Sequence, residues 1–153
     1  MDQHQRIDCR VLRQDDRAAW EPLFKGYQDF YRISLEEIVV DTTWRRFHDP
    51  AEPVFAAGAC HDDRLLGIVH YIFHRSTWML GPTCYLQDLF TVPDARSRGV
   101  GRRLIEFVYE RAAEAGAGRV YWLTHESNAP GRILYDRVAE NAGFIQYRKN
   151  LDT

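Results

Sequence analysis

Residues 96–103, Arg-Ser-Arg-Gly-Val-Gly-Arg-Arg, have the types and spacing to hold a phosphate group. Gly99 and Gly101 leave the backbone open to a ligand at the start of an expected helix, whose free N–H groups and positive dipole end attract anions. The arginines add guanidinium groups that donate paired hydrogen bonds to phosphate oxygens. A solvated basic turn explains the same residues. The spacing excludes a Walker P-loop and a Rossmann fingerprint.

The elements that would position this segment follow from hydrophobic patterns along the chain. Apolar, β-branched or alternating stretches predict strands at residues 7–13, 54–60, 66–74, 84–91, 119–124 and 144–147. Caps and helical periodicity predict helices from Asp15 or Asp16 to Tyr31, from a Ser34 and Glu37 capping box toward Phe47, over 99–115, and from the Asn128 cap to Gly143. The order βααβββαβαβ predicts a mixed α/β fold, with parallel pairs in its last β-α-β units.

The arginine and glycine segment resembles a motif of a known superfamily. Residues 92–105, VPDARSRGVGRRLI, resemble motif A of the GNAT superfamily of acetyl-CoA-dependent N-acetyltransferases. Arg96, Gly99 and Gly101 stand at matching positions, whereas Ser97 replaces a common glycine. The resemblance implies that this segment binds the pyrophosphate of acetyl-CoA.

A second stretch, residues 121–144, resembles motif B of the same superfamily. That motif has an asparagine before a helix and a tyrosine seven residues later, and Asn128 and Tyr135 hold those places. The resemblance covers essentially the whole chain. It implies a GNAT-type fold, a mostly antiparallel, splayed mixed sheet flanked by helices, in a single N-acetyltransferase domain over residues 1–153.

Acetyl-CoA is the co-substrate that the resemblance implies. In the family it lies in a gap where the strand before motif A separates from the next parallel strand. Backbone groups of that strand would contact the pantetheine arm and acetyl carbonyl, and the motif A segment would hold the pyrophosphate. The expected coenzyme contacts are Leu89, Phe90, Thr91, Val92, Arg96, Arg98, Gly99, Val100, Gly101, Arg102, Arg103, Asn128, Arg132 and Arg137.

The resemblance makes Tyr135 the candidate general acid. A phenol can donate a proton to the thiolate that leaves when an amine attacks the thioester. The alternative is a tyrosine packed in the core beside Leu134 and Val138.

The general base is left open by the sequence. Residues 85–90, Tyr-Leu-Gln-Asp-Leu-Phe, are similar to a strand of polyamine- and diamine-type acetyltransferases in which a glutamate takes the proton of the amine, and Gln87 stands at that catalytic position. An amide is no base at neutral pH, although it can orient a water. Three possibilities follow: a water chain, Asp88 or Glu126. Strand alternation puts Asp88 on the face opposite Gln87 unless a bulge intervenes, and Glu126 is otherwise a solvated loop carboxylate.

A tryptophan and two histidines are further candidates for the site. Trp44 ends a helix in the region where the family shapes its acceptor pocket, and it belongs either to that pocket or to the core. His70 and His74 lie on one strand face with no third ligand, which predicts a solvent-facing row and no metal site.

Composition narrows the remaining classes of function. The 153 residues carry 20 Lys and Arg against 22 Asp and Glu, so bulk attraction to nucleic acid is not expected. No apolar run reaches the length of a membrane span, and the polar start is no signal peptide. The three cysteines are scattered along the chain, and free thiols of this kind are typical of the reducing cytoplasm.

The expected function is transfer of the acetyl group of acetyl-CoA to a small polyamine-, amino-acid- or aminoalkyl-like amine. By the resemblance we expect a homodimer, with no nucleic-acid or membrane partner. The alternative is a coenzyme A-binding sensor or partner module with little activity, which the absence of a carboxylate at Gln87 suggests.

Overall fold

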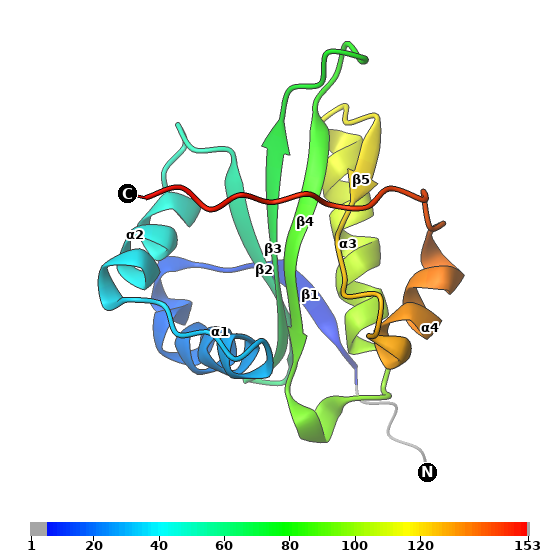
Figure 1. The fold of residues 1–153 in the computed structure, drawn as a ribbon. Helices are drawn as coiled ribbons and strands as arrows, with labels where there is room; N and C mark the ends of the chain where they lie inside the picture. The colour runs from blue at the N-terminus through cyan, green and yellow to red at the C-terminus, as the bar shows by residue number, and fades with distance from the viewer. Residues whose placement is uncertain (1–5, 153) are drawn as a thin grey trace. The chain divides into compact units, whose positions relative to one another are not determined.

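A five-stranded mixed sheet organises the chain, of which the computed structural model describes residues 6–152. The strands are β1 (Asp8–Val11), β2 (Val54–His61), β3 (Arg64–His74), β4 (Thr83–Thr91) and β5 (Arg119–Tyr121). They lie in the order β1-β2-β3-β4-β5 (Figure 1). Each neighbouring pair is antiparallel except β4 and β5, which are parallel. The predicted mixed, mostly antiparallel sheet is therefore confirmed.

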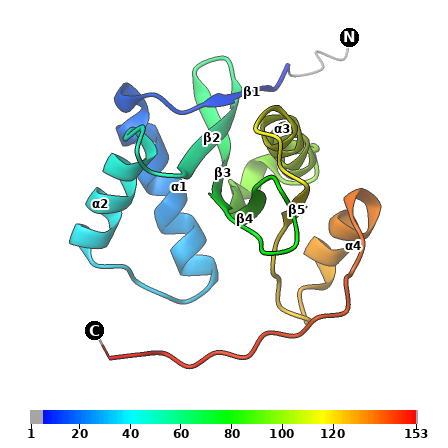
Figure 2. The same ribbon diagram turned by 90° about the horizontal axis from the view of Figure 1, so that it is seen from above.

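Three helices cover this sheet, two on one face and one on the other. Helices α1 (Arg17–Phe30) and α2 (Glu37–Phe47) lie on one face, and α3 (Val100–Glu114) lies on the opposite face (Figures 1 and 2). Short 3-10 turns, η1 (Gln14–Asp16) and η2 (Pro93–Ala95), lead into α1 and out of β4. Connection of parallel β4 and β5 through α3 is the crossover that the sequence predicted.

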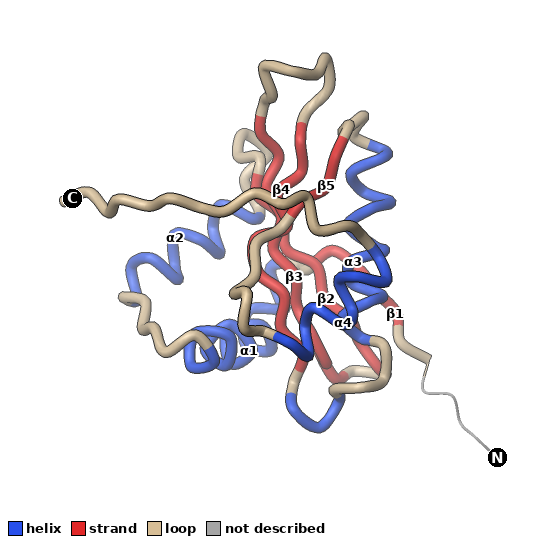
Figure 3. The backbone as a smooth tube through the Cα atoms, turned by 45° about the vertical axis from the view of Figure 1, so that its right-hand side comes forward, coloured by secondary structure: helices blue, strands red, loops and turns tan. Residues whose placement is uncertain are grey.

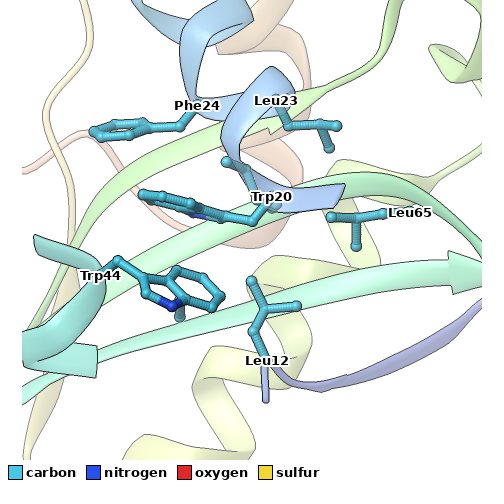
Figure 4. Close-up of a cluster of buried hydrophobic side chains, with 8 residues drawn as sticks. Leu12, Trp20, Leu23, Phe24, Trp44 and Leu65 are labelled. Atoms are coloured by element: carbon cyan, nitrogen blue, oxygen red, sulfur yellow. The ribbon is translucent and has the colours of Figure 1, made fainter. Parts of the chain in front are cut away.

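The core between α1, α2 and the sheet is built around aromatic rings. Trp20 is fully buried, and its ring centroid lies 5.2 Å from that of Phe24 and 4.7 Å from that of Trp44. Figure 4 shows Trp20 between these two side chains. Ile68 of β3 belongs to the same cluster, so alternate residues of β3 face α1 and α2. Such a rigid aromatic layer fixes one face of β3 and β4.

The start of α2 differs from its prediction. The N-cap is Glu36, and neither Ser34 nor Glu37 forms the predicted capping box. The side chain of Gln28 in α1 accepts a 2.9 Å hydrogen bond from the backbone N–H of Leu35. This tertiary contact holds the connection between the helices and replaces the local cap.

Gly67 of β3 allows α3 to approach the sheet closely. A Cβ at this position would lie 2.8 Å from Cγ1 of Val100 and 3.0 Å from the carbonyl oxygen of Phe90. Val100 is the first residue of α3, so the small glycine sets how near the beginning of that helix lies to β4.

Residues 124–152 belong to a second compact unit, Thr124–Thr153, distinct from Met1–Leu123. It contains α4 (Ala129–Val138), whose N-cap Asn128 accepts a hydrogen bond from the N–H of Gly131 as predicted. The helix ends before the predicted Gly143, because Ala139 is already extended. The side chain of Asn141 then accepts a hydrogen bond from Gly143 N–H, a local turn that competes with helix.

The predicted last strand at residues 144–147 is wrong for the part of the chain that the structure describes. Residues after α4 run as loop (Figure 3). The apolar pattern of Phe144, Ile145 and Tyr147 suits a strand, but a strand forms only where a neighbouring backbone pairs with it. The order of elements thus departs from βααβββαβαβ in its final strand. The single domain over 1–153 stays a prediction.

Candidate active site

The gap next to β4 begins where β5 stops pairing with it. Thr83, Cys84 and Tyr85 pair with residues 119–121 of β5. From Leu86 to Thr91, β4 continues beside β3 alone in the sheet that the structure describes. Backbone N–H and C=O groups on that side of β4 are therefore available to a ligand with amide groups of its own. The predicted contacts at residues 89–92 lie along this free edge.

The glycine-rich segment forms the N-terminus of α3, as predicted. Gly99 is the N-cap with φ 79°, and Ser97 has φ 66°. Both lie in the left-handed region that favours glycine, which explains why glycine is common where Ser97 stands. The first N–H groups of α3 have no acceptor within the helix. They form a binding place for an anion.

The arginines around this N-terminus are exposed, and Arg96, Arg102 and Arg103 already make hydrogen bonds. Nε of Arg96 donates to the carbonyl of Thr91 at 3.2 Å, and Arg102 pairs with Glu106 at 2.9 Å on the helix surface. Arg103 differs, because its backbone N–H donates to Gly99 and its guanidinium donates to the carbonyl of Ile7. The backbone N–H and the guanidinium of Arg103 are therefore used in structural hydrogen bonds. An anion would contact the residues that precede Arg103.

An ion pair holds the turn that precedes this segment. Arg64 at the start of β3 donates two hydrogen bonds of 2.7 Å to the carboxylate of Asp94 in η2. The hydrogen bonds lower the pKa of Asp94 below its usual value. This pairing fixes the turn between β4 and α3, and with it the position of the anion-binding N–H groups.

The hydrogen-bonding groups at the α3 N-terminus and along the free edge of β4 fit acetyl-CoA. The α3 N-terminus with Arg96, Arg98 and Arg102 provides donors for a pyrophosphate, and the free edge of β4 suits the amide-containing pantetheine arm. Residues 88 and 92 are about 13 Å apart along an extended strand. A ligand held at the helix would therefore need an extended arm to reach Asp88.

A β-bulge in β4 decides which side chain faces the helices α1 and α2. His70 of β3 is paired with Asp88, whereas the next residue, Tyr71, is paired with Leu86. Gln87 is the extra residue, and its side chain is exposed. A bulge re-aims the side chains that follow it. This bulge interrupts the alternation of side chains along β4 and turns Asp88 toward α1 and α2, where the acceptor is expected.

The carboxylate of Asp88 is held by two hydrogen-bond partners. Its Oδ2 lies 2.8 Å from Nδ1 of His70, and the hydroxyl of Tyr27 in α1 also hydrogen-bonds it. Burial, followed by the charge of Asp88, raises the pKa values of Tyr27 and Tyr31, so both stay protonated phenols near this carboxylate. The Asp88 side chain is 13% exposed, and within the described residues it pairs with no lysine or arginine. A carboxylate of this kind attracts a cationic amine.

Three other candidates, Trp44, His70 and His74, differ in their exposure. Trp44 is buried in the aromatic core, which supports packing rather than a pocket wall. The predicted solvent-facing histidine row is wrong for His70, which is 2% exposed among rings from α1 and α2. His74 is exposed and bonds the hydroxyl of Tyr121. In residues 6–152 no group of three histidine, cysteine or acidic residues could hold a metal.

The second unit carries the remaining candidates on and before α4. Asn128 caps the helix and also donates to the hydroxyl of Thr124 at 3.0 Å. The guanidinium of Arg132 donates to the backbone carbonyl of Glu126 at 2.8 Å, while the Glu126 carboxylate is exposed. Tyr135 lies on α4 with intermediate exposure, and Arg137 is exposed in the last turn. These contacts order the beginning of α4.

Sequence reasoning missed the contribution of α1 to this region. An open pocket of about 490 Å³ lies between α1 and the end of β4 and is lined in part by Leu23, Gly26, Phe30, Phe90, Val92 and Arg96. Gly26 permits the contact, since a Cβ there would lie 2.8 Å from the ring of Phe90. Tyr27 and His70 were likewise missed as partners of Asp88. Their contacts with Asp88 depend on the bulge in β4, which no local sequence pattern indicates.

Comparison with known proteins identifies the family. The model of the acetyltransferase (GNAT) family matches residues 19–139. The D-amino-acid N-acetyltransferase HPA3 of Saccharomyces cerevisiae is 37% identical over 147 residues, which cover 95% of this chain and 91% of that protein. The chain belongs to the acetyltransferase (GNAT) family. It is thus an acyltransferase of the N-acetyltransferase type, which confirms the resemblance seen in the two motifs.

More distant similarities agree with this membership. The thialysine N-epsilon-acetyltransferase of Mus musculus is 28% identical over 103 residues, 64% of this chain and 60% of that protein. The structure of AAC(6')-Iy in complex with a bisubstrate analogue, CoA-S-monomethyl-acetylneamine, matches with a TM-score of 0.82 at 19% identity, covering 95% of this chain and 99% of that one. At this identity the structural likeness shows the shared fold. The described residues contain no helix long and apolar enough to cross a membrane.

Proposed function

We propose that this chain transfers the acetyl group of acetyl-CoA directly to the primary amine of a small polyamine-, amino-acid- or aminoalkyl-like molecule. The observation that carries the proposal is the bulge at Gln87, which turns Asp88 toward α1 and α2 beside the free edge of β4. Amino-acid-like amines are the first to test, because two relatives are named for amino-acid acceptors.

Different residues of the chain carry out the different steps of acyl transfer. The bound thioester supplies the acetyl group and the leaving thiol. Asp88 attracts the ammonium form of the acceptor and takes a proton from it, directly or through a water, so that the free amine attacks the carbonyl carbon. Backbone N–H groups of β4 polarise the carbonyl oxygen. As the amide forms, the nitrogen releases its remaining extra proton to water, and as the carbon–sulfur bond breaks, Tyr135 gives a proton to the sulfur.

Thiol release tests this function directly. Purified full-length chain is incubated with acetyl-CoA and a panel of D- and L-amino acids, diamines and polyamines, and free thiol is measured with and without each amine. We expect amine-dependent release for at least one class. Tight binding of acetyl-CoA without amine-dependent release for any member would instead support the coenzyme A-binding module.

The left-handed N-cap of α3 provides a test of the coenzyme site. Gly99→Val should lower the affinity for acetyl-CoA by about tenfold, because a left-handed conformation costs a side chain about 1–2 kcal/mol. A Cβ at Gly99 meets nothing within 4 Å, so the effect arises from backbone strain at φ 79° and not from a clash. Isothermal titration calorimetry measures it.

Ser97→Gly is the matched control for that variant. Ser97 already has φ 66°, so glycine there relieves strain and should leave acetyl-CoA affinity equal or higher. Equal affinities of Gly99→Val and wild-type chains would argue against this N-terminus as the coenzyme site.

We also propose that the chain forms a homodimer through its C-terminal segment and acts in the cytoplasm. Phe144, Ile145, Tyr147 and Leu151 are exposed apolar residues in a segment with strand-like sequence. Free cysteines at 9, 60 and 84 suit a reducing compartment. Sedimentation equilibrium should give twice the mass of one chain, and Ile145→Asp should shift it to one chain. A monomeric wild-type chain at all concentrations would contradict the dimer.

A further inference from the structure

A line of buried hydrogen bonds runs from the core to Asp88. The indole Nε1–H of Trp20 donates to Nε2 of His70 at 2.9 Å. Nδ1 of His70 lies 2.8 Å from Oδ2 of Asp88. Trp20 and His70 are both buried, at 0% and 2% exposure. The three side chains come from α1, β3 and β4, so only the tertiary structure joins them.

The donor at one end of this line fixes the form of the histidine. An indole nitrogen can only donate, so Nε2 of His70 must accept and carries no proton. The proton of the neutral ring is then on Nδ1, where it is donated to the Asp88 carboxylate. Trp20 thereby selects one of two tautomers, and with it the direction of the hydrogen bond to Asp88.

Packing leaves His70 little freedom to change this arrangement. Its ring centroid lies 5.0 Å from that of Phe24 and 4.9 Å from that of Phe47, on the sides of α1 and α2. The polar groups near the pair include the indole N–H of Trp20, the hydroxyl of Tyr27, which also bonds Asp88, and the phenol of Tyr31. A carboxylate held in this way keeps one orientation as substrate binds.

We propose that His70, oriented by Trp20, is a positioning residue for Asp88. It binds Oδ2 and thereby fixes the orientation in which the carboxylate meets the acceptor amine. This role rests on the proposed function, because it assigns to His70 the alignment of the carboxylate that binds and deprotonates the amine. Removal of its donor should affect the amine and leave acetyl-CoA binding unchanged, since the coenzyme contacts lie farther along β4 and at α3.

Steady-state kinetics on four chains test this role. His70→Leu removes the donor, and kcat/KM for the amine should fall about 10- to 100-fold, as expected when a reacting group is misplaced. His70→Asn places an amide N–H near the position of Nδ1 and should restore the value to within about fivefold of wild type. Phe47→Leu, which alters packing on the same ring without removing a hydrogen bond, is the control and should change it by less than about threefold.

A spectroscopic measurement tests the tautomer without any turnover. In protein labelled with ¹⁵N-histidine, the His70 signal, assigned by its loss in His70→Asn, should show a protonated Nδ1 and an unprotonated Nε2. Trp20→Phe removes the indole donor and should shift the signal toward a mixture of tautomers. A protonated Nε2 in the wild-type chain would overturn the proposal.

The outcomes separate this inference from the function on which it rests. Unchanged kcat/KM in folded His70→Leu, with an active wild-type chain, overturns the role of His70 alone. Equal losses in His70→Leu and His70→Asn also overturn it, because a donor at the Nδ1 position would then be irrelevant. A wild-type chain that binds acetyl-CoA but acetylates no amine overturns the proposed function, whatever tautomer His70 shows.

Discussion

Asp88→Asn is expected to lower kcat/KM for the acceptor amine by about 100-fold or more, the usual range for a lost general base. The asparagine oxygen can still accept from His70, so the substitution removes the charge and the basicity while keeping this hydrogen bond. Thiol release at varied amine concentration measures the effect, and calorimetry should show acetyl-CoA affinity unchanged.

Gln87→Ala is the matched control for this variant. Gln87 is the exposed residue of the bulge, next to Asp88 in the chain, and its loss should change kcat/KM far less. If Asp88→Asn stayed within about threefold of wild type, a value far below general-base effects, Asp88 would not be the base. Glu126 or a water chain would then take its place, and Glu126→Gln would distinguish the two.

Tyr135→Phe is expected to lower kcat by about 100-fold with acetyl-CoA as donor, because the departing thiolate loses its proton source. The KM for acetyl-CoA should stay close to the wild-type value, since the hydroxyl acts in the transition state. Tyr109→Phe on α3 is the control for loss of a phenol elsewhere in the chain. Stopped-flow measurement of thiol release records both variants.

The choice of leaving group separates acid catalysis from packing. A thioester of a more acidic thiol needs less protonation, so the loss in Tyr135→Phe should become smaller with such a donor. A loss of the same size with both donors would indicate that Tyr135 supports the structure of α4 and not the departure of the thiol.

Local sequence was sufficient to predict the segment that we propose for coenzyme binding. The strand, turn and helix around residues 92–105 are adjacent in the chain, and their signals are short-range: a proline after the strand, glycines at the helix start and an apolar stripe on α3. The Asn128 cap was predictable for the same reason, because the cap and the N–H of Gly131 are three residues apart. Such interactions form wherever these residues meet, whatever surrounds them.

The region that we propose for the acceptor depends on contacts between distant segments. Whether Asp88 or Gln87 faces α1 and α2 depends on a bulge set by pairing with β3, and one residue of register reverses the face of every side chain. His70 and Trp20 are 50 residues apart in sequence, and the burial of both comes from α1 and α2 packing on β3.

The sequence by itself determined the class of fold, the family and the glycine-rich beginning of α3. The tertiary structure decided that Asp88 faces α1 and α2 beside the bulge at Gln87, and it joined this carboxylate to His70 and Trp20. It also left residues 144–147 outside the sheet, although their apolar pattern suits a strand. The physical reason is the same in each case: caps and helix ends are satisfied by near neighbours, whereas strand register, strand pairing and burial require a partner that the local sequence does not specify.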